Sequence, residues 1–247
     1  MLPEHETIFA KLLGSLKGSG NFAVMSGPQG VGKIAFCLKL LSTLELHTSR
    51  YKTLHLARPP MDTSACMQQI SAALGNTNES GSLDPIRGIS SALVDAYQAG
   101  KHVIIIMDDA HALSEEVLED MYLLARTSTD SEFKLLVLLV GQPELNATLK
   151  QEQLAQIGSR LLFNSELTPL SPEATRNYIN YRLKKAGHTG PEVFTGEAIE
   201  QLHALSRGSP RIINSLCHSA LLAAASVNSD LVEASHLQTV NNQKSGQ

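Results

Sequence analysis

One short stretch limits the folds open to this chain more than any other: SGPQGVGK, residues 26–33, directly after the apolar run FAVM. It matches the pattern G-x-x-x-x-G-K from Gly27 to Lys33, in which glycines let the backbone curl and turn its N–H groups toward phosphate oxygens. Such a loop works only between a buried strand and a helix, whose N-terminus adds partial positive charge. We therefore predict a strand at residues 22–27 and a helix at residues 34–44.

Within this loop, phosphates are expected to contact backbone N–H groups and the Lys33 ammonium. The residues predicted to bind nucleotide are Gly27, Pro28, Gln29, Gly30, Val31, Gly32, Lys33 and Ile34. Ile34 stands where the pattern has serine or threonine, whose hydroxyl is a magnesium ligand. Isoleucine cannot coordinate a metal, so water would have to complete the octahedral shell. The loop thus predicts binding of ATP, with Mg2+ positioned less firmly than usual.

A second apolar run, VIIIMDDAH (residues 103–111), ends in two acids and supplies the other half of such a site. We expect Asp108 to hold magnesium through water and Asp109 to orient the attacking water, a role that usually belongs to glutamate. Aspartate is shorter than glutamate, and hydrolysis depends mainly on positioning, so the retracted carboxylate is expected to slow the reaction. Ile34 and Asp109 together leave open whether this chain is an effective ATP hydrolase.

Apolar runs alternate with helical patterns through much of the chain. Besides the run before the loop, four more are predicted as strands, the last weaker than the others: residues 53–57, 102–109, 134–141 and 165–170. Residues 114–127 have an amphipathic helical pattern with Ser114 as N-cap. The repetition of strand and helix predicts an α/β domain with a parallel sheet between two helical layers.

From residue 171 onward the patterns are helical only, and each helical segment opens with a serine or threonine suited to capping. We therefore divide the chain into a P-loop nucleotide-binding core at residues 1–170 and a C-terminal helical lid at residues 171–247. The lid ends in the polar sequence NNQKSGQ.

Composition argues against several classes of protein. The net charge of −4 gives no overall attraction to nucleic acid or anionic membrane. The three cysteines are far apart, without zinc or redox-motif spacing. No apolar run approaches the roughly 20 residues of a membrane helix, and no signal peptide pattern opens the chain. We expect a cytoplasmic protein, with any contact to the inner membrane made through a partner or through a segment that this chain lacks.

Taken together, these motifs resemble those of AAA+ ATPases, and more narrowly of the ExeA/GspA/MshM group of bacterial envelope-assembly ATPases. The segments that carry the resemblance are SGPQGVGK, DDAH, GQPEL, LTPLSPEATRNYINYRLKKAG and RGSPRIINSLCHSALLAA. The last three are the more specific, because phosphate loops occur in many unrelated proteins. DamX-type ATPase domains and TnsC/TniB transposition ATPases look similar too. The resemblance implies an AAA+ core with a helical lid, ATP and Mg2+ as cofactors, and a homo-oligomer.

The resemblance also implies roles for three residues that the phosphate-loop pattern does not reach. Gln142, in GQPEL, matches the sensor-1 region that contacts the γ-phosphate or its water. Arg160, in IGSRLLF, stands where the family has an arginine finger that acts on a neighbouring subunit. Arg211, in GSPRIIN, matches sensor 2, which extends from the lid to the phosphates.

Three functions remain open at the level of sequence. The first is a slow ATPase that acts as an oligomeric assembly factor on an unidentified envelope or membrane protein, in an envelope, secretion or cell-division system. The second is a nucleotide-binding scaffold without effective hydrolysis, which Ile34 and Asp109 favour. The third is a DNA-binding transposition regulator that uses basic residues such as Arg182, Lys184 and Lys185; the acidic balance of the chain counts against it.

Overall fold

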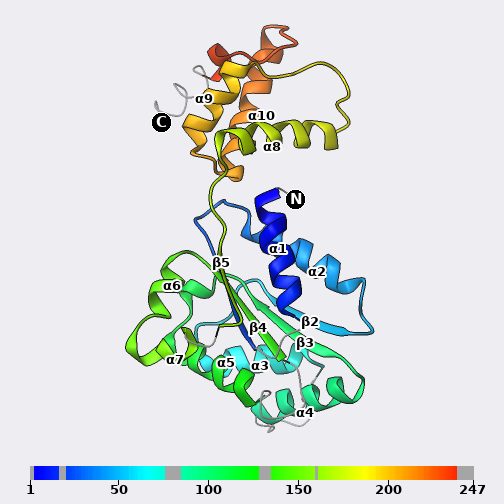
Figure 1. Ribbon diagram of the computed structural model, residues 1–247, viewed down its shortest axis with the longest axis vertical. Coiled ribbons are helices and arrows are strands. Elements are labelled where there is room, and N and C mark those ends of the chain that lie inside the picture. The colour runs from blue at the N-terminus through cyan, green and yellow to red at the C-terminus, as the bar shows by residue number, and fades with distance from the viewer. Residues whose placement is uncertain (1–2, 17–20, 76–84, 128–134, 159–160, 238–247) are drawn as a thin grey trace. The chain divides into compact units, whose positions relative to one another are not determined.

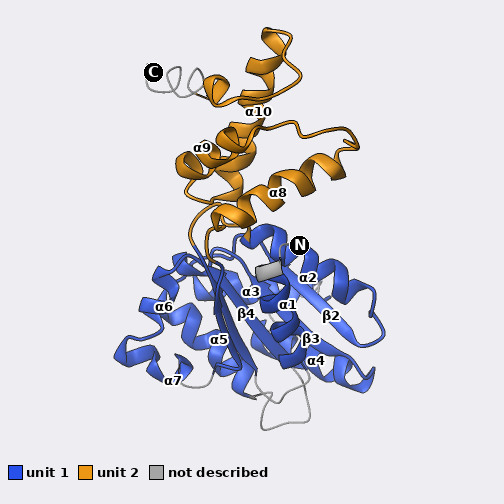
Figure 2. Ribbon diagram, turned by 45° about the horizontal axis from the view of Figure 1, so that its top comes forward, with its two compact units in different colours: residues 1, 3–27, 33–167 blue, residues 2, 28–32, 168–247 orange. Residues whose placement is uncertain are grey.

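The computed structural model describes residues 3–16, 21–75, 85–127, 135–158 and 161–237. These residues form two compact units, drawn in different colours in Figure 2. The first unit comprises residues 3–27 and 33–167, and the second comprises residues 28–32 together with the chain from residue 168 onward. None of the helices within these ranges has the combination of length and apolar character that a membrane span requires.

The first unit is built on a five-stranded sheet in which all neighbouring strands are parallel. Its strands are β1 (Phe22–Ser26), β2 (Tyr51–Leu56), β3 (His102–Met107), β4 (Leu135–Gly141) and β5 (Phe163–Glu166). Their spatial order is β2-β3-β4-β1-β5. The predicted α/β class with a parallel sheet is confirmed. Because the strands run in one direction, their carboxyl ends share one edge of the sheet.

Helices connect these strands and cover both faces of the sheet. They are α1 (Pro3–Ser15), α2 (Lys33–Glu45), α3 (Thr63–Ala73), α4 (Pro85–Gln98), α5 (Glu115–Thr127), α6 (Glu144–Thr148) and α7 (Ala155–Gly158), with short 3-10 turns η1 (Ala110–Ala112) and η2 (Glu152–Leu154). Figure 1 shows α1 and α2 on one side of the sheet and α3, α4 and α5 on the other. Right-handed crossovers produce this division when the chain first moves to β2 and then returns toward β4.

The core of the first unit is aliphatic and lies mainly between the sheet and α3, α4 and α5. Alternate residues of the central strands, such as Val103 and Ile105, pack there in one cluster with Ile70 and Met121. Residues between them in the strands point to the opposite face because side chains alternate along a strand. On that side Phe9 of α1 meets the ring of Phe36 edge-on, at 5.5 Å between centroids.

The fifth strand is the one whose prediction was off in position. It was expected at residues 165–170 but begins and ends earlier, at Phe163–Glu166. The Leu167 N–H still donates to the Ser26 carbonyl at 2.8 Å, but Pro169 has no N–H to continue such a ladder. By contrast, the N-cap predicted for α5 is present, since the Ser114 hydroxyl accepts from the Val117 N–H at 3.4 Å.

The second unit contains α8 (Pro172–Lys185), α9 (Gly196–Ser206) and α10 (Pro210–Ser226). Its own core consists of aliphatic residues from these helices and the chain around them: Leu170, Ile179, Phe194, Ala198, Ile199, Leu202, Ile213, Leu216, Ala220, Ala224, Val232 and Leu237. Side-chain caps begin two of the helices, because the hydroxyls of Ser171 and Thr195 each accept a backbone N–H at 3.1 Å.

A tight turn joins α9 to α10 and ties down the chain that enters α8. Arg207 and Gly208 both adopt positive φ angles, 49° and 74°. The Gly208 carbonyl accepts the Leu170 N–H at 2.9 Å, and a Cβ on Gly208 would overlap the Leu170 carbonyl oxygen. Only glycine fits this turn without displacing backbone.

Candidate nucleotide-binding site

The residues of the first unit that were predicted to act on nucleotide follow three adjacent strands. Gly27 comes directly after β1, Asp108 directly after β3 and Gln142 directly after β4. Since β1 pairs with β4 and β4 with β3, these residues lie at one edge of the sheet. Ligands of open parallel sheets bind outside this edge. The Gly27 N–H donates to the Gly141 carbonyl at 3.2 Å and thereby joins the start of the loop to β4.

Lys33 begins α2 and is nearly buried, with 9% of its surface exposed. Its Nζ donates to the Gly27 carbonyl at 2.6 Å. Burial lowers the pKa of Lys33, and the negative charges of Asp108, Asp109 and Glu144 oppose that shift. The ammonium therefore lies within the field of both acids that follow β3, where a phosphate group would find a partly desolvated positive charge.

Asp108 is the most enclosed acid of this edge, with 5% of its surface exposed. Its Oδ1 accepts the Asp109 N–H at 2.9 Å, and its own N–H donates to the Leu56 carbonyl at 2.9 Å. Burial raises the pKa of Asp108, and the Asp109 N–H opposes that rise. A desolvated carboxylate gains from a nearby cation, and Mg2+ in proteins takes one or two carboxylates, with water and phosphate oxygens as its other ligands. Asp108, with Asp109 beside it, fits that requirement.

Asp109 has an unusual backbone conformation, with φ of 52° and ψ of 29°. Left-handed geometry is uncommon outside glycine, although aspartate and asparagine tolerate it better than other residues. The residue is exposed and immediately precedes η1. Backbone strain of this kind costs on the order of 1–3 kcal/mol and is often found at functional sites.

His111 and Gln142 meet across the carboxyl ends of β3 and β4. The Nε2 atoms of the two side chains are 2.8 Å apart. An amide nitrogen can only donate, so the histidine accepts through Nε2 and carries its proton on Nδ1. Among the described residues this Nδ1 has no hydrogen-bond partner, although it is buried. His111 thus fixes the side chain of Gln142 from one side.

Two residues near the site were missed by the sequence analysis. His55, at the end of β2, and Glu144, at the start of α6, are close enough for their charges to influence Asp108 and Lys33 respectively. Neither residue belongs to a recognisable motif, but the position of each in the sheet places it near the site. His55 is on the strand next to β3, and Glu144 lies shortly after the end of β4, so the rule that strand ends share an edge would have included them.

Residues 28–32 belong to the second unit, as does Arg211 at the start of α10. The Arg211 N–H and the Ser209 hydroxyl donate to the Gly30 carbonyl, at 3.2 and 3.4 Å. Gly30 has a φ of 79°, and a Cβ there would lie 2.8 Å from the Ser209 Oγ and 3.0 Å from the Arg211 Cβ. Arg211 therefore lies next to the loop in which it was predicted to act.

The remaining predicted residues differ in their placement. The side chain of Ile34, which stands where the pattern has a hydroxyl, is 62% exposed, so the described residues leave most of it uncovered. Arg160 lies outside the described residues. The catalytic, nucleotide and metal roles of all these residues remain predictions.

Comparison with known proteins gives a family match and several related structures. A family model described as an AAA domain matches residues 16–149. General secretion pathway protein A of Aeromonas hydrophila is 34% identical over 224 residues, which are 91% of this chain and 41% of that protein. The chain therefore spans about two fifths of the length of this curated relative.

The related solved structures are more distant in sequence. The Aeropyrum pernix ORC2 protein in its ADP form has a TM-score of 0.68 at 14% identity, over 95% of this chain and 66% of that one. The Aeropyrum pernix ORC1 protein in complex with DNA has a TM-score of 0.66 at 19% identity, over 98% and 66%. The Thermotoga maritima RuvB Holliday junction branch migration motor has a TM-score of 0.59 at 17% identity, over 95% and 67%. At such identities these structures are informative about the fold alone.

Proposed function

Because the chain belongs to the family of AAA domains, we propose that it binds ATP with Mg2+ and hydrolyses it slowly, as an oligomeric assembly factor of a bacterial envelope, secretion or cell-division system. Residues 1–170 would be the nucleotide-binding core and residues 171–247 the lid. The observation that carries the proposal is that Lys33 lies within the electrostatic influence of Asp108 and Asp109 at the carboxyl edge of a parallel sheet. Gln142 follows the strand between theirs.

In this proposal, each residue of the sheet edge would have a role that suits its surroundings. The nearly buried ammonium of Lys33 would contact terminal phosphates, where charge-assisted hydrogen bonds are about twice as strong as neutral ones. Asp108 would hold the hydrated magnesium ion, which neutralises charge on the phosphates. Gln142, fixed by His111, would contact the γ-phosphate or the attacking water, and Arg211 would contact the phosphates from the lid.

Slow hydrolysis of ATP is expected because of the side chains at two positions of the site. Ile34 offers no oxygen to magnesium, and Asp109 places its carboxylate on a shorter side chain than glutamate would. Both changes affect the positioning of the attacking water and metal more than they affect ground-state binding of the nucleotide. We therefore expect ATP to bind with ordinary affinity but to be cleaved slowly.

The proposed role in an envelope or secretion system is based on the similarity to General secretion pathway protein A. General secretion pathway protein A is named for secretion, and the 34% identity extends over most of this chain. We propose that this chain likewise serves a secretion-related system, with an envelope or inner-membrane protein as its partner. Arg160 would then complete the site of a neighbouring subunit, so turnover should rise with protein concentration.

The test is phosphate release at saturating ATP and Mg2+ by the wild type, Ile34→Thr, Asp109→Glu and the double variant. We expect about tenfold faster turnover or more in the double variant, with nucleotide affinity little changed. Ile34→Val is the matched control, because it alters the side chain without supplying a ligand. The left-handed backbone at residue 109 favours aspartate, so the stability of Asp109→Glu must be measured alongside.

A hydrolysis-deficient scaffold is the second candidate, favoured by the same two positions. It predicts that the repaired double variant, at high concentration and with magnesium, binds ATP but releases no phosphate. Faster phosphate release in the double variant would contradict it.

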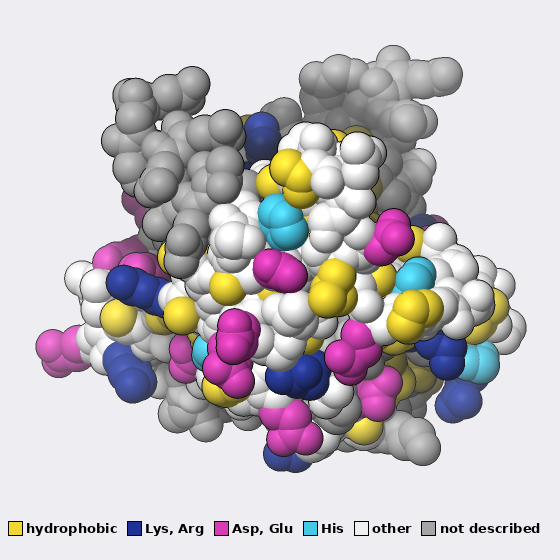
Figure 3. All heavy atoms as spheres, turned by 90° about the horizontal axis from the view of Figure 1, so that it is seen from above, with side chains coloured by type: hydrophobic (Ala, Val, Ile, Leu, Met, Phe, Trp, Pro, Cys, Tyr) yellow, Lys and Arg dark blue, Asp and Glu magenta, His cyan; other side chains and the backbone are white. Residues whose placement is uncertain are grey.

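A DNA-binding transposition regulator is the third candidate and is less favoured. On the face shown in Figure 3, acidic and basic side chains of the described residues are interspersed rather than gathered by sign. The net charge of −4 also gives no general attraction to phosphate backbones. Filter binding to duplex DNA across a salt series decides the matter, because true phosphate contacts give a steep dependence on salt.

A further inference from the structure

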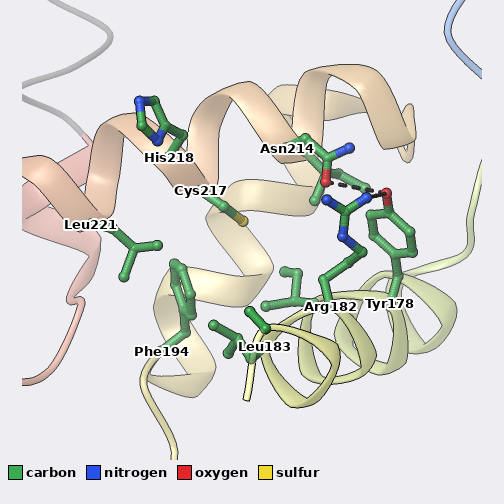
Figure 4. A pocket seen from close by; sticks show the side chains of 11 residues that line it. Tyr178, Arg182, Leu183, Phe194, Asn214, Cys217, His218 and Leu221 are labelled. Carbon is green, nitrogen blue, oxygen red and sulfur yellow. Dashed lines mark hydrogen bonds between the residues drawn. The ribbon is translucent and has the colours of Figure 1, made fainter. Parts of the chain in front are cut away.

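A cavity of about 360 Å³ opens in the second unit, between α8 and α10. Figure 4 shows it from close by, with Tyr178, Arg182 and Leu183 of α8 facing residues of α10. Phe194, in the segment that precedes α9, forms part of its border. All of its lining residues belong to the second unit, and none was assigned a role in nucleotide binding.

One side of this lid pocket is apolar. Leu183, Phe194, Ile213, Cys217 and Leu221 contribute aliphatic, aromatic and thiol groups to it. Phe194 is 2% exposed and fixed in the core of the unit, whereas Leu221 is 36% exposed. The wall thus combines a rigid inner part with an accessible apolar rim. A volume of this size is at the low end of the range for ligand pockets, roughly 300–1,000 Å³.

The other side is polar and is organised around Arg182. Its Nη1 donates to the Tyr178 hydroxyl at 3.4 Å, and that hydroxyl donates to the Asn214 Oδ1 at 3.1 Å. The guanidinium also lies 6.0 Å from the centroid of the Tyr178 ring. These contacts orient the guanidinium toward α10, as Figure 4 shows. They use one of its nitrogens, so the others keep donors for a ligand.

The lining of the pocket carries positive charge from Arg182 and no negative charge. Its titratable lining side chains are Tyr178, Arg182, Cys217 and His218, and no aspartate or glutamate is among the lining residues. Within the described chain, Arg182 forms no ion pair with a carboxylate: its hydrogen bond and its ring contact are both with Tyr178. An exposed, oriented arginine beside an apolar wall is suited to an acidic group that carries an apolar neighbour.

From this arrangement we propose that the lid pocket binds a short acidic segment of a partner protein. A carboxylate of the segment pairs with the guanidinium of Arg182, and an adjacent leucine-sized or phenylalanine-sized side chain occupies the wall formed by Leu183, Phe194 and Leu221. Charge complementarity selects this occupant, because a basic or neutral segment would leave Arg182 without its counter-charge. The size of the cavity limits the buried part to one or two large side chains.

The first experiment identifies the preferred sequence with a phage-displayed library of random twelve-residue peptides, selected on the full 247-residue chain and in parallel on Arg182→Glu. We expect wild-type selections to be enriched in aspartate or glutamate next to leucine, isoleucine, methionine or phenylalanine, and this motif to be lost on the variant. The proposal is overturned by selections that yield no motif, or one that persists on Arg182→Glu.

The second experiment measures the affinity of the enriched peptide, synthesised with a fluorophore, by anisotropy. Arg182→Gln, which keeps a donor for Tyr178, and Leu221→Asp, at an exposed position, should each weaken binding about tenfold or more, as the loss of a charge-assisted contact or an apolar anchor implies. Lys185→Gln is the matched control, because its ammonium lies 5.8 Å from the Tyr181 ring and does not line the pocket. Its affinity should stay within about twofold of the wild type.

A charge exchange distinguishes recognition from a structural effect of Arg182. The peptide whose acidic residue is replaced by lysine should bind Arg182→Glu better than it binds the wild type. Equal binding of both peptides to both proteins would overturn the proposal, as would sedimentation showing that the same surface joins two copies of this chain and is closed to peptide. ATP hydrolysis is not required in any of these measurements, so their outcome is independent of the proposed function.

Discussion

The carboxyl edge of the parallel sheet and the lid pocket both present charged side chains, but different features of the fold bring those side chains together. At the sheet edge, the ends of β1, β3 and β4 bring Lys33, Asp108 and Gln142 together although they are far apart in sequence. In the second unit, the side chains that line the space between α8 and α10 come from the helices and from the segment before α9, and no strand positions them. Backbone geometry thus determines the first site, and side-chain packing determines the second.

The two sites also differ in how their charged groups are solvated. Lys33 and Asp108 are almost buried, so each has a displaced pKa and each depends on a counter-charge. Arg182 is exposed and keeps its solvent. The first site therefore suits ligands with several charges, and the second suits one contact of moderate strength.

The largest effect is expected on the stability of the second unit, at the turn between α9 and α10. Gly208→Ala should lower the free energy of unfolding by about 4 kcal/mol or more, because a Cβ would overlap the Leu170 carbonyl as well as strain the backbone. Gly187→Ala is the matched control: its φ is 93°, but no atom lies within 4 Å of an added Cβ, so about 1–2 kcal/mol is expected. Hydrogen exchange of α8–α10 amides measures both. Equal costs for the two variants would contradict this account of the turn.

A smaller effect is expected at the sheet edge, in the binding of nucleotide. Lys33→Ala should weaken ATP binding at least about tenfold, because it removes charge-assisted contacts to the phosphates from a nearly buried position. Lys39→Ala, at an exposed position of the same helix, is the control and should leave the affinity unchanged. Calorimetry that finds no loss in Lys33→Ala would remove the phosphate-loop assignment.

A smaller effect is expected from the contact between His111 and Gln142. His111→Ala should slow ATP turnover about two- to tenfold, the range that one neutral hydrogen bond represents, while ATP affinity changes little. A double-mutant cycle with Gln142→Ala checks the physical reason. If His111 acts by holding Gln142, the second substitution should add little to the first. Additive losses would mean that the two residues act separately.

The smallest effect concerns the pH dependence of a thiol in the lid pocket. Burial raises the pKa of Cys217 to about 12, so the reactive thiolate is scarce at neutral pH and grows about tenfold per pH unit until that pKa is reached. Alkylation by iodoacetamide, followed by mass spectrometry, should therefore still accelerate between pH 8 and 10, where an ordinary thiol would level off. Cys217→Ser identifies the modified site. A plateau near pH 9 would show a solvated thiol and weaken the contrast in burial between the pocket wall and Arg182.

Sequence patterns were sufficient for the parts of the molecule that backbone rules determine. The apolar runs before Gly27 and Asp108 are strands, and the phosphate-loop pattern is followed by α2 as expected. The strand after residue 160 was placed too late, because its apolar residues extend beyond the point where Pro169 interrupts pairing. No sequence pattern signalled the left-handed backbone of Asp109, which depends on the turn into η1.

The contacts that the sequence did not reveal are those between distant side chains. His111 and Gln142 are 31 residues apart, and Tyr178 and Asn214 are 36 apart. The first contact forms because β3 and β4 are neighbours in the sheet, and a short motif carries no information about which strands are neighbours. The second depends on how α8 packs against α10, and several packings would satisfy the same helical periodicity. The lid pocket is therefore a product of tertiary packing that the helical sequence patterns do not specify.

The hydrogen bond from the Arg211 N–H to the Gly30 carbonyl has one further consequence. It links the start of α10 to the phosphate loop through main-chain atoms, so a change in the orientation of the Gly30 peptide must either break this bond or move the helix with it. The loop and the start of α10 are thus coupled through the peptide group of residue 211, whatever its side chain. Replacing the arginine side chain would leave this hydrogen bond intact, whereas proline at position 211, which lacks an N–H, would remove it.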